Sequence, residues 1–530
     1  MRKWFLNVFV FTASVCKAQD IDVLHYTFAL GLNDRTDTIS GLASIQFTHL
    51  TNNRKITFDL TAVNYEGKGM KVQQVRLRFK DTRPLPIMQK TQTLEIEFPL
   101  AKAGDTQTVQ IFYKGVPDDG LIISKNKFGD RTFFADNWPN RAHHWIPCID
   151  KPDDKASFEF EISAPSYYQV VSNGIKIEER MAPGGDKATI WKEETPQPTK
   201  VMVIGVAKFA TKTFDDSPKD IPISAWVYPQ DSTKGFYDYA LAPEIVKFFS
   251  SYIAPYPYKK LANVQSKTIF GGMENASAIF YAESSVTGDR SSEDLMAHEI
   301  AHQWFGDMAS EKSFAHLWLS EGFATYFTHL YLEKKYGKEA MIKRLKKDRD
   351  EVIAFSKTST HAVVDSTKDL MSLLNANSYQ KGGWILHMLR AEVGDTTFRK
   401  IIQAYYNQYK GSNADTRDFE GVAEKVSGKE LTWFFDQWLY RPGIPGLNLS
   451  WKYKNGNVEV LHPGNHKESE FNLLTDLLFV YRNGKSEKHV LQLESRGHAL
   501  VKIPSKEKPL KIILDPEARL LFEGKISEIK

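Results

Sequence analysis

Cysteine is scarce in this sequence, and the two that occur, Cys16 and Cys148, lie far apart in a chain of 530 residues. Cys16 falls in a segment that we expect to be removed, which would leave Cys148 alone and exclude an internal disulfide. The folded chain must then derive its stability from large hydrophobic cores. We interpret Cys148 as a small buried side chain in a turn rather than as a reactive thiol.

Long hydrophobic runs are also missing, and beyond the N-terminus no apolar stretch is long enough to cross a membrane. At the N-terminus the basic pair Arg2-Lys3 precedes a short, mostly apolar stretch over residues 4–15, and small residues follow up to Ala18. This order predicts a signal peptide over residues 1–18 and an exported protein, periplasmic or secreted. A lipid anchor at Cys16 is disfavoured because the residue before it is not small.

An excess of charge of either sign is absent as well. The full sequence has a formal net charge of +4, and removal of residues 1–18, which hold three basic and no acidic residues, lowers it to +1. A nearly neutral chain argues against a general nucleic-acid-binding protein. The hydrophobic fraction of 42% and the aromatic fraction of 12% are enough to build several cores, so 530 residues predict more than one domain.

Residues 19–210 show the pattern of a β domain. Segments such as His25–Leu32 alternate apolar and polar residues, with turn residues between them, which favours an open antiparallel arrangement. An aromatic loop over residues 137–147 interrupts the pattern, and such a loop is usually functional or critical for packing. Its adjacent His143 and His144 cannot share a helix face, so we favour a structural role over metal binding for them.

Two further domains follow from the change of pattern along the chain. Residues 211–441 are mostly helical in periodicity, and the breaker-rich segment Arg441–Gly446 ends this region. Residues 442–530 return to short strands, with hairpin turns predicted at Asn455-Gly456 and Asn483-Gly484. The number and length of these strands favour a β-sandwich of immunoglobulin-like type.

The pattern His-Glu-x-x-His stands at positions 298–302, near the middle of the helical region. On an α-helix, residues four apart lie one turn apart on the same face, so His298 and His302 can direct two imidazoles at one ion. Glu299 projects beside them and can hold a proton. This combination is typical of a zinc hydrolase.

A catalytic zinc site usually has three protein ligands and one open position, so a third ligand is required. Glu321 is the candidate, because it stands in a second apolar-periodic run, 19 residues after His302. That gap is enough for a helix end, a loop and the start of a returning helix. The alternative, a helix with two core histidines and a surface glutamate, is disfavoured once Glu321 is included.

Several segments in the same order resemble the aminopeptidase N family of zinc metallopeptidases, which are gluzincins. Besides the His-Glu-x-x-His segment, they are Pro147–Pro152, Phe270–Asn275, Leu319–Tyr326 and Tyr379–Gly383. The segment Phe270–Asn275 resembles the family's Gly-x-Met-Glu-Asn exopeptidase motif. The likeness extends over about residues 24–446, and its combination of motifs is highly specific.

The resemblance implies a multidomain α+β fold. It comprises an N-terminal antiparallel β domain, a thermolysin-like, mostly helical catalytic domain over residues 211–441, and the C-terminal β-sandwich. It also implies one Zn²⁺ per chain, held by His298, His302 and Glu321. Glu299 would then be the general base that takes a proton from a zinc-activated water.

The remaining motifs imply roles for four more residues. Tyr379 matches the family's tyrosine that stabilises the oxyanion of the tetrahedral intermediate. Glu274 matches the residue that binds the free α-ammonium group of the substrate. Gly271 and Gly272 lack side chains, so the backbone there can approach a substrate as an edge strand does.

Two features depart from the family pattern. The loop before the Pro147–Pro152 turn carries two extra residues, and Asp136 or Asn137 falls nearest to the position of a second amine-binding residue. The family often carries a further large helical domain after the β-sandwich. Because this sequence ends at Lys530, we expect a form that lacks that domain.

Together these observations predict a zinc-dependent aminopeptidase that hydrolyses N-terminal residues from peptides with a free N-terminus. A gluzincin endopeptidase is the first alternative, and a strong preference for blocked peptides would favour it. A catalytically silent peptide-binding module is a second alternative, against which the intact Glu299 and Tyr379 argue. Because one family relative hydrolyses a lipid epoxide, that chemistry is a remote further option.

Overall fold

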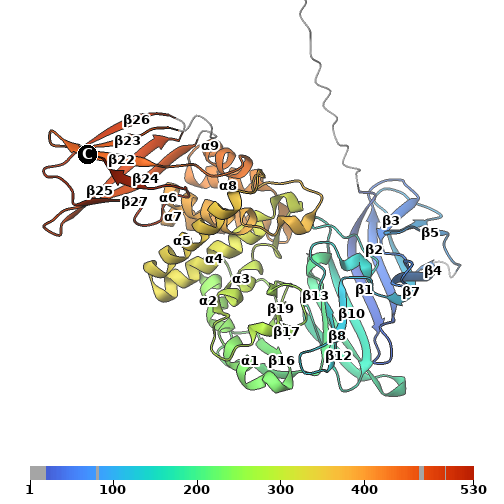
Figure 1. Ribbon diagram of the computed structural model, residues 1–530. Helices are drawn as coiled ribbons and strands as arrows, with labels where there is room; N and C mark the ends of the chain where they lie inside the picture. Colours follow the sequence, from blue (N-terminus) through green and yellow to red (C-terminus); the bar gives the residue numbers. More distant parts are fainter. Residues whose placement is uncertain (1–18, 79–82, 465–470, 496, 530) are drawn as a thin grey trace, which may run out of the picture.

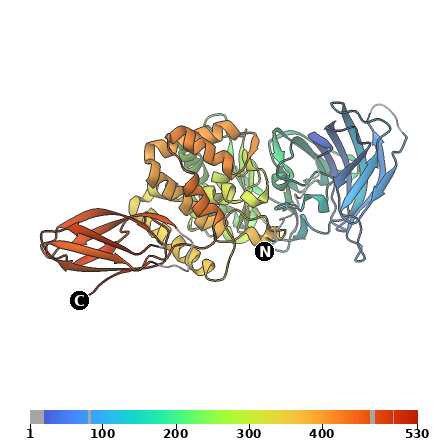
Figure 2. The ribbon, with the colours of Figure 1, turned by 90° about the horizontal axis from the view of Figure 1, so that it is seen from above.

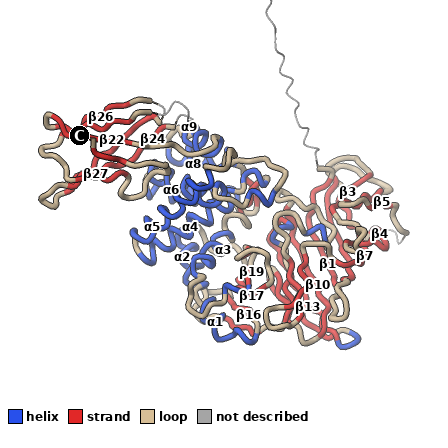
Figure 3. Tube along the Cα trace, in the orientation of Figure 1, coloured by secondary structure: helices blue, strands red, loops and turns tan. Residues whose placement is uncertain are grey.

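The computed structural model describes residues 19–78, 83–464, 471–495 and 497–529. These residues form three parts in a row: a β-rich part at one end, a mostly helical part in the middle and a smaller β part at the other end (Figure 1, Figure 2). Figure 3 shows the change from strands to helices and back to strands along this row. The predicted signal peptide, residues 1–18 with Cys16, lies outside the described residues.

The N-terminal part is built on a seven-stranded sheet with the strand order β12-β13-β10-β1-β2-β7-β4. Its strands are β1 (Ile21–Gly31), β2 (Ile39–His49), β4 (Gly69–Leu77), β7 (Thr106–Val116), β10 (Lys155–Pro165), β12 (Ile175–Met181) and β13 (Asp186–Pro198). The expectation of a wholly antiparallel domain is wrong, because β1 pairs with β10 in parallel. Every second residue of β10 is buried, and this alternation has the same period in both kinds of sheet.

Two smaller sheets complete this part, in the orders β3-β6-β5 and β11-β14-β9-β8. Their strands are β3 (Lys55–Asp59), β5 (Ile87–Gln89), β6 (Thr93–Glu97), β8 (Leu121–Lys125), β9 (Arg131–Ala135), β11 (Gln169–Ser172) and β14 (Ile204–Ala207). The aromatic loop follows β9. In the turn after it, Cys148 is free and buried, and its backbone exchanges hydrogen bonds of 2.7 and 3.1 Å with Asp59. A structural role for this cysteine agrees with the sequence interpretation.

The middle part combines helices with a five-stranded sheet of order β15-β16-β17-β19-β18. The strands are β15 (Ala210–Thr213), β16 (Ile223–Val227), β17 (Leu261–Ser266), β18 (Gly272–Met273) and β19 (Ala278–Ala282). A separate parallel pair is formed by β20 (Ala309–Glu311) and β21 (Ser412–Ala414). The short strand β18 therefore lies at the edge of its sheet, with one side open.

Helices make up most of the middle part, as the sequence predicts. They are α1 (Ser232–Tyr239), α2 (Ala242–Tyr252), α3 (Glu293–His302), α4 (Trp318–Tyr336), α5 (Lys338–Ser356), α6 (Gly382–Val393), α7 (Asp395–Tyr409), α8 (Thr416–Ser427) and α9 (Thr432–Phe435). The central helix is α4, whose residues 318–332 are all buried and which contacts α3, α5 and α6. A helix that is buried all round can present side chains to the interior from any face.

The C-terminal part consists of two sheets with the orders β26-β23-β22-β28 and β25-β24-β27. Their strands are β22 (Leu449–Lys454), β23 (Asn457–His462), β24 (Asn472–Val480), β25 (Ser486–Glu494), β26 (Ala499–Pro504), β27 (Lys511–Leu514) and β28 (Ile526–Glu528). The predicted Asn455-Gly456 hairpin turn is confirmed, with φ values of 51° and 73° that match a two-residue turn. The immunoglobulin-like assignment stays a prediction.

None of the helices formed by the described residues is long and apolar enough to span a membrane.

Candidate active site

Helices α3 and α4 carry the predicted metal ligands. Helix α3 has two acidic residues, Glu293 and Asp294, in its first turn, where their charges interact favourably with the helix dipole. The helix ends at His302. The chain then passes through a loop that contains β20 and returns as α4, with Glu321 in the first turn. The prediction of a helix end, a loop and a returning helix between His302 and Glu321 is confirmed.

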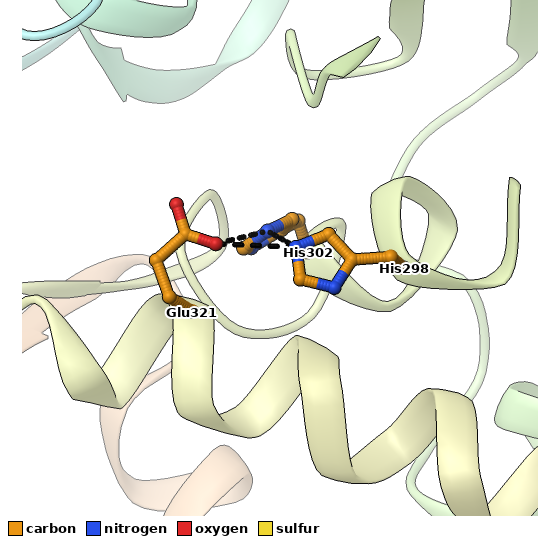
Figure 4. Close-up of side chains that lie close together, drawn as sticks. All are labelled: His298, His302 and Glu321. Carbon is orange, nitrogen blue, oxygen red and sulfur yellow. Dashed lines mark hydrogen bonds and ion pairs between the residues drawn. The ribbon is translucent and has the colours of Figure 1, made fainter. Parts of the chain in front are cut away.

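His298, His302 and Glu321 form a compact triangle of donor atoms (Figure 4). The Nε2 atom of His298 is 3.1 Å from His302 Nε2 and 3.1 Å from Glu321 Oε2, and His302 Nε2 is 3.2 Å from the same carboxylate oxygen. A tetrahedral zinc ion with bonds of ~2.0–2.2 Å requires ligand atoms roughly 3.3 Å apart or slightly more. The triangle is only slightly tighter than that requirement.

The hydrogen bonds of His302 decide which of its nitrogens carries the proton. Its Nδ1 atom lies 3.1 Å from the carbonyl oxygen of Phe305, which can only accept, so Nδ1 is the donor in the neutral ring. In the neutral ring, Nε2 then presents a lone pair to the second imidazole and to the Glu321 carboxylate. Three such donor atoms in close contact repel one another unless a proton or a metal ion lies between them, and a metal ion can bind all three at once, so these residues fit a metal ion.

The charges around the triangle also favour a cation. Burial disfavours charge on His302, but the carboxylates of Glu274 and Glu321 outweigh it and raise the pKa of His302 to about 10. Burial acts to raise the pKa of Glu321, but the imidazoles of His302 and His298 overcome it and hold that pKa well below its usual value. Burial raises the pKa of Glu299 well above the usual range. A divalent ion would balance this concentration of carboxyl groups.

A second set of possible donors, from Glu274, Glu299 and His302, also lies within 4.8 Å. It contains a single imidazole, and burial raises the pKa of both its carboxyl groups. The set of His298, His302 and Glu321 offers two imidazole nitrogens and one carboxylate, a donor set found at catalytic zinc sites, so it fits zinc better.

Glu299 lies against the glycines that precede Glu274. A Cβ atom on Gly272 would be 2.4 Å from Glu299 Oε1, so a side chain there would collide with this carboxylate. Gly272 belongs to the edge strand β18, whose open side can pair with an extended peptide. Gly271 is exposed directly before it. The sequence predicts the approach of a substrate backbone here, and the structure adds a steric reason for Gly272.

Tyr379 lies in a π-helical turn, η8 (Asn377–Lys381), directly before α6. Such turns occur frequently at functional sites. Its ring stacks on that of His298, with centroids 5.9 Å apart and an interplanar angle of 15°. Burial, together with the carboxyl groups of Glu321 and Glu274, raises the pKa of Tyr379 well above its usual value. The phenol therefore keeps its proton and can act as a hydrogen-bond donor.

Glu274 is 5% exposed, and its Oε1 atom has no hydrogen-bond partner among the described residues. The backbone oxygen of Glu274 accepts a 2.7 Å hydrogen bond from the side-chain amide of Gln303, which also donates to Asp307 at 2.9 Å. Gln303 directly follows His302. The segment that bears Glu274 is thus tied to the end of α3, the helix that carries His298 and His302.

Asp136 does not point its carboxylate into the site. Its two oxygens accept hydrogen bonds from Arg141 at 2.7 Å, from the Thr268 hydroxyl at 3.1 Å and from the Ile269 amide at 2.9 Å. Burial raises the pKa of Asp136, while Arg141 acts in the opposite direction. The carboxylate anchors the segment that leads to Gly271 rather than lying free to bind an amine.

Asn137 is likewise used inside the protein. Its amide donates to the backbone oxygens of Thr199 and Met202, and its oxygen accepts from the Trp145 indole. His143 contacts Asp150 and Gln92, in agreement with the predicted structural role of the histidine pair.

A cavity of about 250 Å³ brings the predicted site residues together. All eight line it: Gly271, Gly272, Glu274, His298, Glu299, His302, Glu321 and Tyr379. Trp138 also lines it and was not predicted from the sequence. Its place in an aromatic loop was the available signal, but that signal did not tell which aromatic residue reaches the cavity.

Sequence models of one peptidase family match most of this chain. The peptidase M1 N-terminal domain matches residues 23–201, and the peptidase family M1 domain matches residues 237–438. Probable aminopeptidase 2 of Sulfurisphaera tokodaii is 30% identical over 87% of this chain and 57% of its own length. Tricorn protease-interacting factor F2 of Thermoplasma acidophilum is 30% identical over 64% of this chain and 44% of its own length. The chain spans about half the length of the curated relatives it matches.

The fold is also that of solved structures. An M1 zinc metallopeptidase of Deinococcus radiodurans superposes with a TM-score of 0.69 and 22% identity, covering 81% of this chain and 95% of that one. Fold and donor set together define a scaffold of the zinc metallopeptidase type. Within that class, the chain belongs to peptidase family M1.

Proposed function

We propose that the protein is a zinc-dependent aminopeptidase that removes N-terminal residues from peptides. The proposal rests on the Oε1 atom of Glu274, which lacks a hydrogen-bond partner among the described residues. Glu274 lines the same cavity as the triangle of His298, His302 and Glu321. A buried carboxylate oxygen costs free energy unless a ligand satisfies it. The α-ammonium group of a peptide supplies both the charge and the hydrogen atoms for this bond.

The metal would be held by His298, His302 and Glu321. A bound zinc ion acts as a Lewis acid that polarises a carbonyl group and lowers the pKa of a water molecule. Glu299 would accept a proton from the attacking water and later donate it to the leaving amine, a role that suits a carboxyl group with a raised pKa. Tyr379 would donate a hydrogen bond to the oxygen on which negative charge develops.

The substrate class we propose is a peptide with a free N-terminus. The open side of β18 would align its backbone, and Glu274 would register its first residue. Relatives named aminopeptidases support this reaction. A structure of a mutant of the Deinococcus radiodurans protein contains a Tyr-Ser-Ala substrate, which supports a short peptide as ligand.

We further propose that residues 1–18 direct export and that the C-terminal β part has an immunoglobulin-like fold. Expression of the full chain, followed by cell fractionation and N-terminal sequencing, tests the first of these. A mature protein that starts at Gln19 in the exported fraction is expected, and an uncleaved protein in the cytoplasm would contradict it.

The aminopeptidase itself is tested with fluorogenic aminoacyl amides, with and without a chelator. We expect hydrolysis that disappears on chelation and returns with zinc. Parallel assays of one peptide with a free and an acetylated N-terminus separate an aminopeptidase from an endopeptidase. Cleavage of the acetylated form alone, or only at internal bonds, would overturn the proposal.

A further inference from the structure

Part of the lining of the active-site cavity is apolar, and we call these residues the apolar wall. It is formed by Trp138, Phe270, Met273, Leu295 and Leu374. The charged or titratable residues of the lining are those to which the proposed reaction already assigns a role, among them Glu274 and Glu299. No carboxylate or ammonium group of the described lining is therefore left to pair with a charged substrate side chain.

Trp138 reaches this wall from the N-terminal part of the chain. Its ring meets Phe270 edge to face at 5.8 Å and 87°, and it meets Phe314 at 5.8 Å and 77°. Both partners belong to the middle part, so the three rings form an aromatic cluster across the boundary of two domains. The Trp138 side chain is buried in that cluster while still lining the cavity.

The loop around Trp138 is fixed on both sides of the boundary. The guanidinium of Arg141 donates to the Trp138 carbonyl at 2.8 Å and to Asp136 at 2.7 Å. Asp136 in turn accepts from Thr268 and from the Ile269 amide, directly before Phe270. The carboxylate that anchors one aromatic residue of the wall thus also anchors the other. A wall held in this way is rigid before a substrate arrives, which favours selection by shape.

The position of the wall indicates that it would contact the side chain of the first residue of a peptide. Met273 directly precedes Glu274, and Phe270 stands on the same segment. The α-carbon of the first residue carries the ammonium group bound by Glu274 and is bonded to the carbonyl that must lie at the metal triangle. Its side chain leaves the same α-carbon, so it begins within two bonds of both groups and must occupy the part of the cavity beside them. The cavity of about 250 Å³ is smaller than the ~300–1,000 Å³ typical of drug-sized ligands, so it has room for about one residue.

We propose that Trp138 and Phe270 are specificity-determining residues that select an uncharged, apolar side chain on the first residue of the substrate. The inference rests on the proposed aminopeptidase function. A leucine or phenylalanine side chain gains stability from the apolar area it buries against this wall. A lysine or glutamate side chain would lose its hydration without meeting an opposite charge in this wall.

The first test uses the wild-type protein and a panel of aminoacyl amides that differ only in the first residue: Leu, Phe, Ala, Lys and Glu. We expect kcat/KM for the Leu and Phe amides to exceed that for the others by roughly tenfold or more, the scale on which hydrophobic pockets discriminate. Equal or higher kcat/KM for the Lys or Glu amide would overturn the inference.

The second test compares Trp138→Ala with Trp138→Phe. Trp138→Ala should lower kcat/KM for the Leu and Phe amides by about tenfold while changing the Ala amide much less, because the lost contacts serve the longer side chains. Trp138→Phe keeps an aromatic wall and should keep the preference. The Leu-to-Ala ratio is measured on one sample, so a partly unfolded fraction cancels, whereas a merely structural role would lower all substrates alike.

Tyr167→Ala is the matched control, since Tyr167 is a 51% exposed aromatic residue of the same domain outside the cavity. Its Leu-to-Ala ratio should equal that of the wild type. An unchanged ratio in Trp138→Ala would overturn the assignment of Trp138. Failure of the zinc-loaded protein to cleave any amide would overturn the proposed function and this inference with it, whereas cleavage without an apolar preference would overturn the inference alone.

Discussion

Tyr379 stacks on His298, with ring centroids 5.9 Å apart and planes inclined by 15°. A tyrosine from the turn before α6 therefore covers one face of the imidazole of a predicted metal ligand, which belongs to α3. The contact depends on the aromatic ring alone, while the chemistry proposed for Tyr379 depends on its hydroxyl group. The two contributions can be separated by a single substitution.

Tyr379→Phe keeps the stacked ring and removes the donor. We expect kcat to fall by about 10²–10³, the usual effect of losing one oxyanion donor, with a smaller change in KM because the charge develops only in the transition state. Steady-state kinetics on a leucyl amide measures both constants. Tyr406→Phe, at a buried tyrosine of α7 outside the cavity, is the control and should keep the wild-type kcat. Wild-type turnover in Tyr379→Phe would remove the hydroxyl from the mechanism.

Glu299→Gln tests the base. The amide has the shape of the carboxylic acid but cannot take up the proton, so kcat should fall by at least about 10²–10⁴. Zinc content should stay the same, because the three ligands are other residues. Glu293→Gln changes the same residue type at the start of the same helix, where Glu293 contacts Lys335 and two tyrosines, and it should leave kcat nearly unchanged. If Glu299→Gln turns over at the wild-type rate, the base is another group.

The proposed metal site predicts one zinc ion per chain. Elemental analysis of the purified protein should give a ratio near one, and Glu321→Ala should lower the ratio by removing one of three ligands. His143→Ala is the control, because His143 belongs to the structural histidine pair and contacts Asp150 instead. A ratio well below one that added zinc does not restore, or loss of zinc from His143→Ala but not from Glu321→Ala, would contradict the assignment.

Local geometry explains why the close approach of the candidate ligands could be predicted from the sequence. The four-residue spacing of His298 and His302 determines their common face once a helix forms, and Glu321 follows after a loop of predictable length. Glu274 and Tyr379 have no such local signal. Their place in the cavity was implied by the family motifs, and the structure brings them to the triangle from segments 24 residues before His298 and 58 residues after Glu321.

Features that depend on contacts between residues far apart in the sequence could not be predicted. The parallel pairing of β1 with β10 joins residues more than 130 positions apart, and the alternation within each strand is the same for either direction. The place of Trp138 in the cavity depends on Phe270 and Phe314, which belong to another domain. The hydrogen bonds of the Asp136 carboxylate could not be predicted for the same reason. Its partners Thr268 and Ile269 are also more than 130 positions away in the sequence.

Two glycines in helices should respond to alanine in opposite ways. A Cβ atom on Gly322 of α4 would lie 2.8 Å from backbone atoms of Gly382 in α6, so Gly322→Ala must separate the helices and should cost about 1–3 kcal/mol of stability. Gly421 of α8 has open space at the same position, and Gly421→Ala should stabilise the protein by about 0.4–1 kcal/mol. Urea or thermal unfolding compares both variants with the wild type. If Gly322→Ala leaves the free energy of unfolding unchanged or raises it as Gly421→Ala does, the result would contradict the close approach of α4 and α6.

We expect Glu274 to restrict cleavage to the peptide bond that follows the first residue of the substrate. The metal, Glu299 and Tyr379 could act on any peptide bond, so another group must recognise the free amine one residue away from the scissile carbonyl. Glu274 has a buried carboxylate oxygen without a partner among the described residues, and a charge-assisted bond to an ammonium group in a partly desolvated cavity is strong. An acetylated N-terminus lacks that charge and adds bulk beside Glu274.

Glu274→Ala should therefore raise KM and lower kcat/KM for peptides with a free amine, while zinc content stays at the wild-type level. The loss should be at least about tenfold, since a hydrogen bond to a charged group contributes about 1.5–3 kcal/mol. For the acetylated form of the same peptide, the wild type should be very slow and the substitution should make little further difference. If the wild type cleaves both forms equally well, Glu274 does not register the terminus, and the endopeptidase alternative accounts for the cavity better.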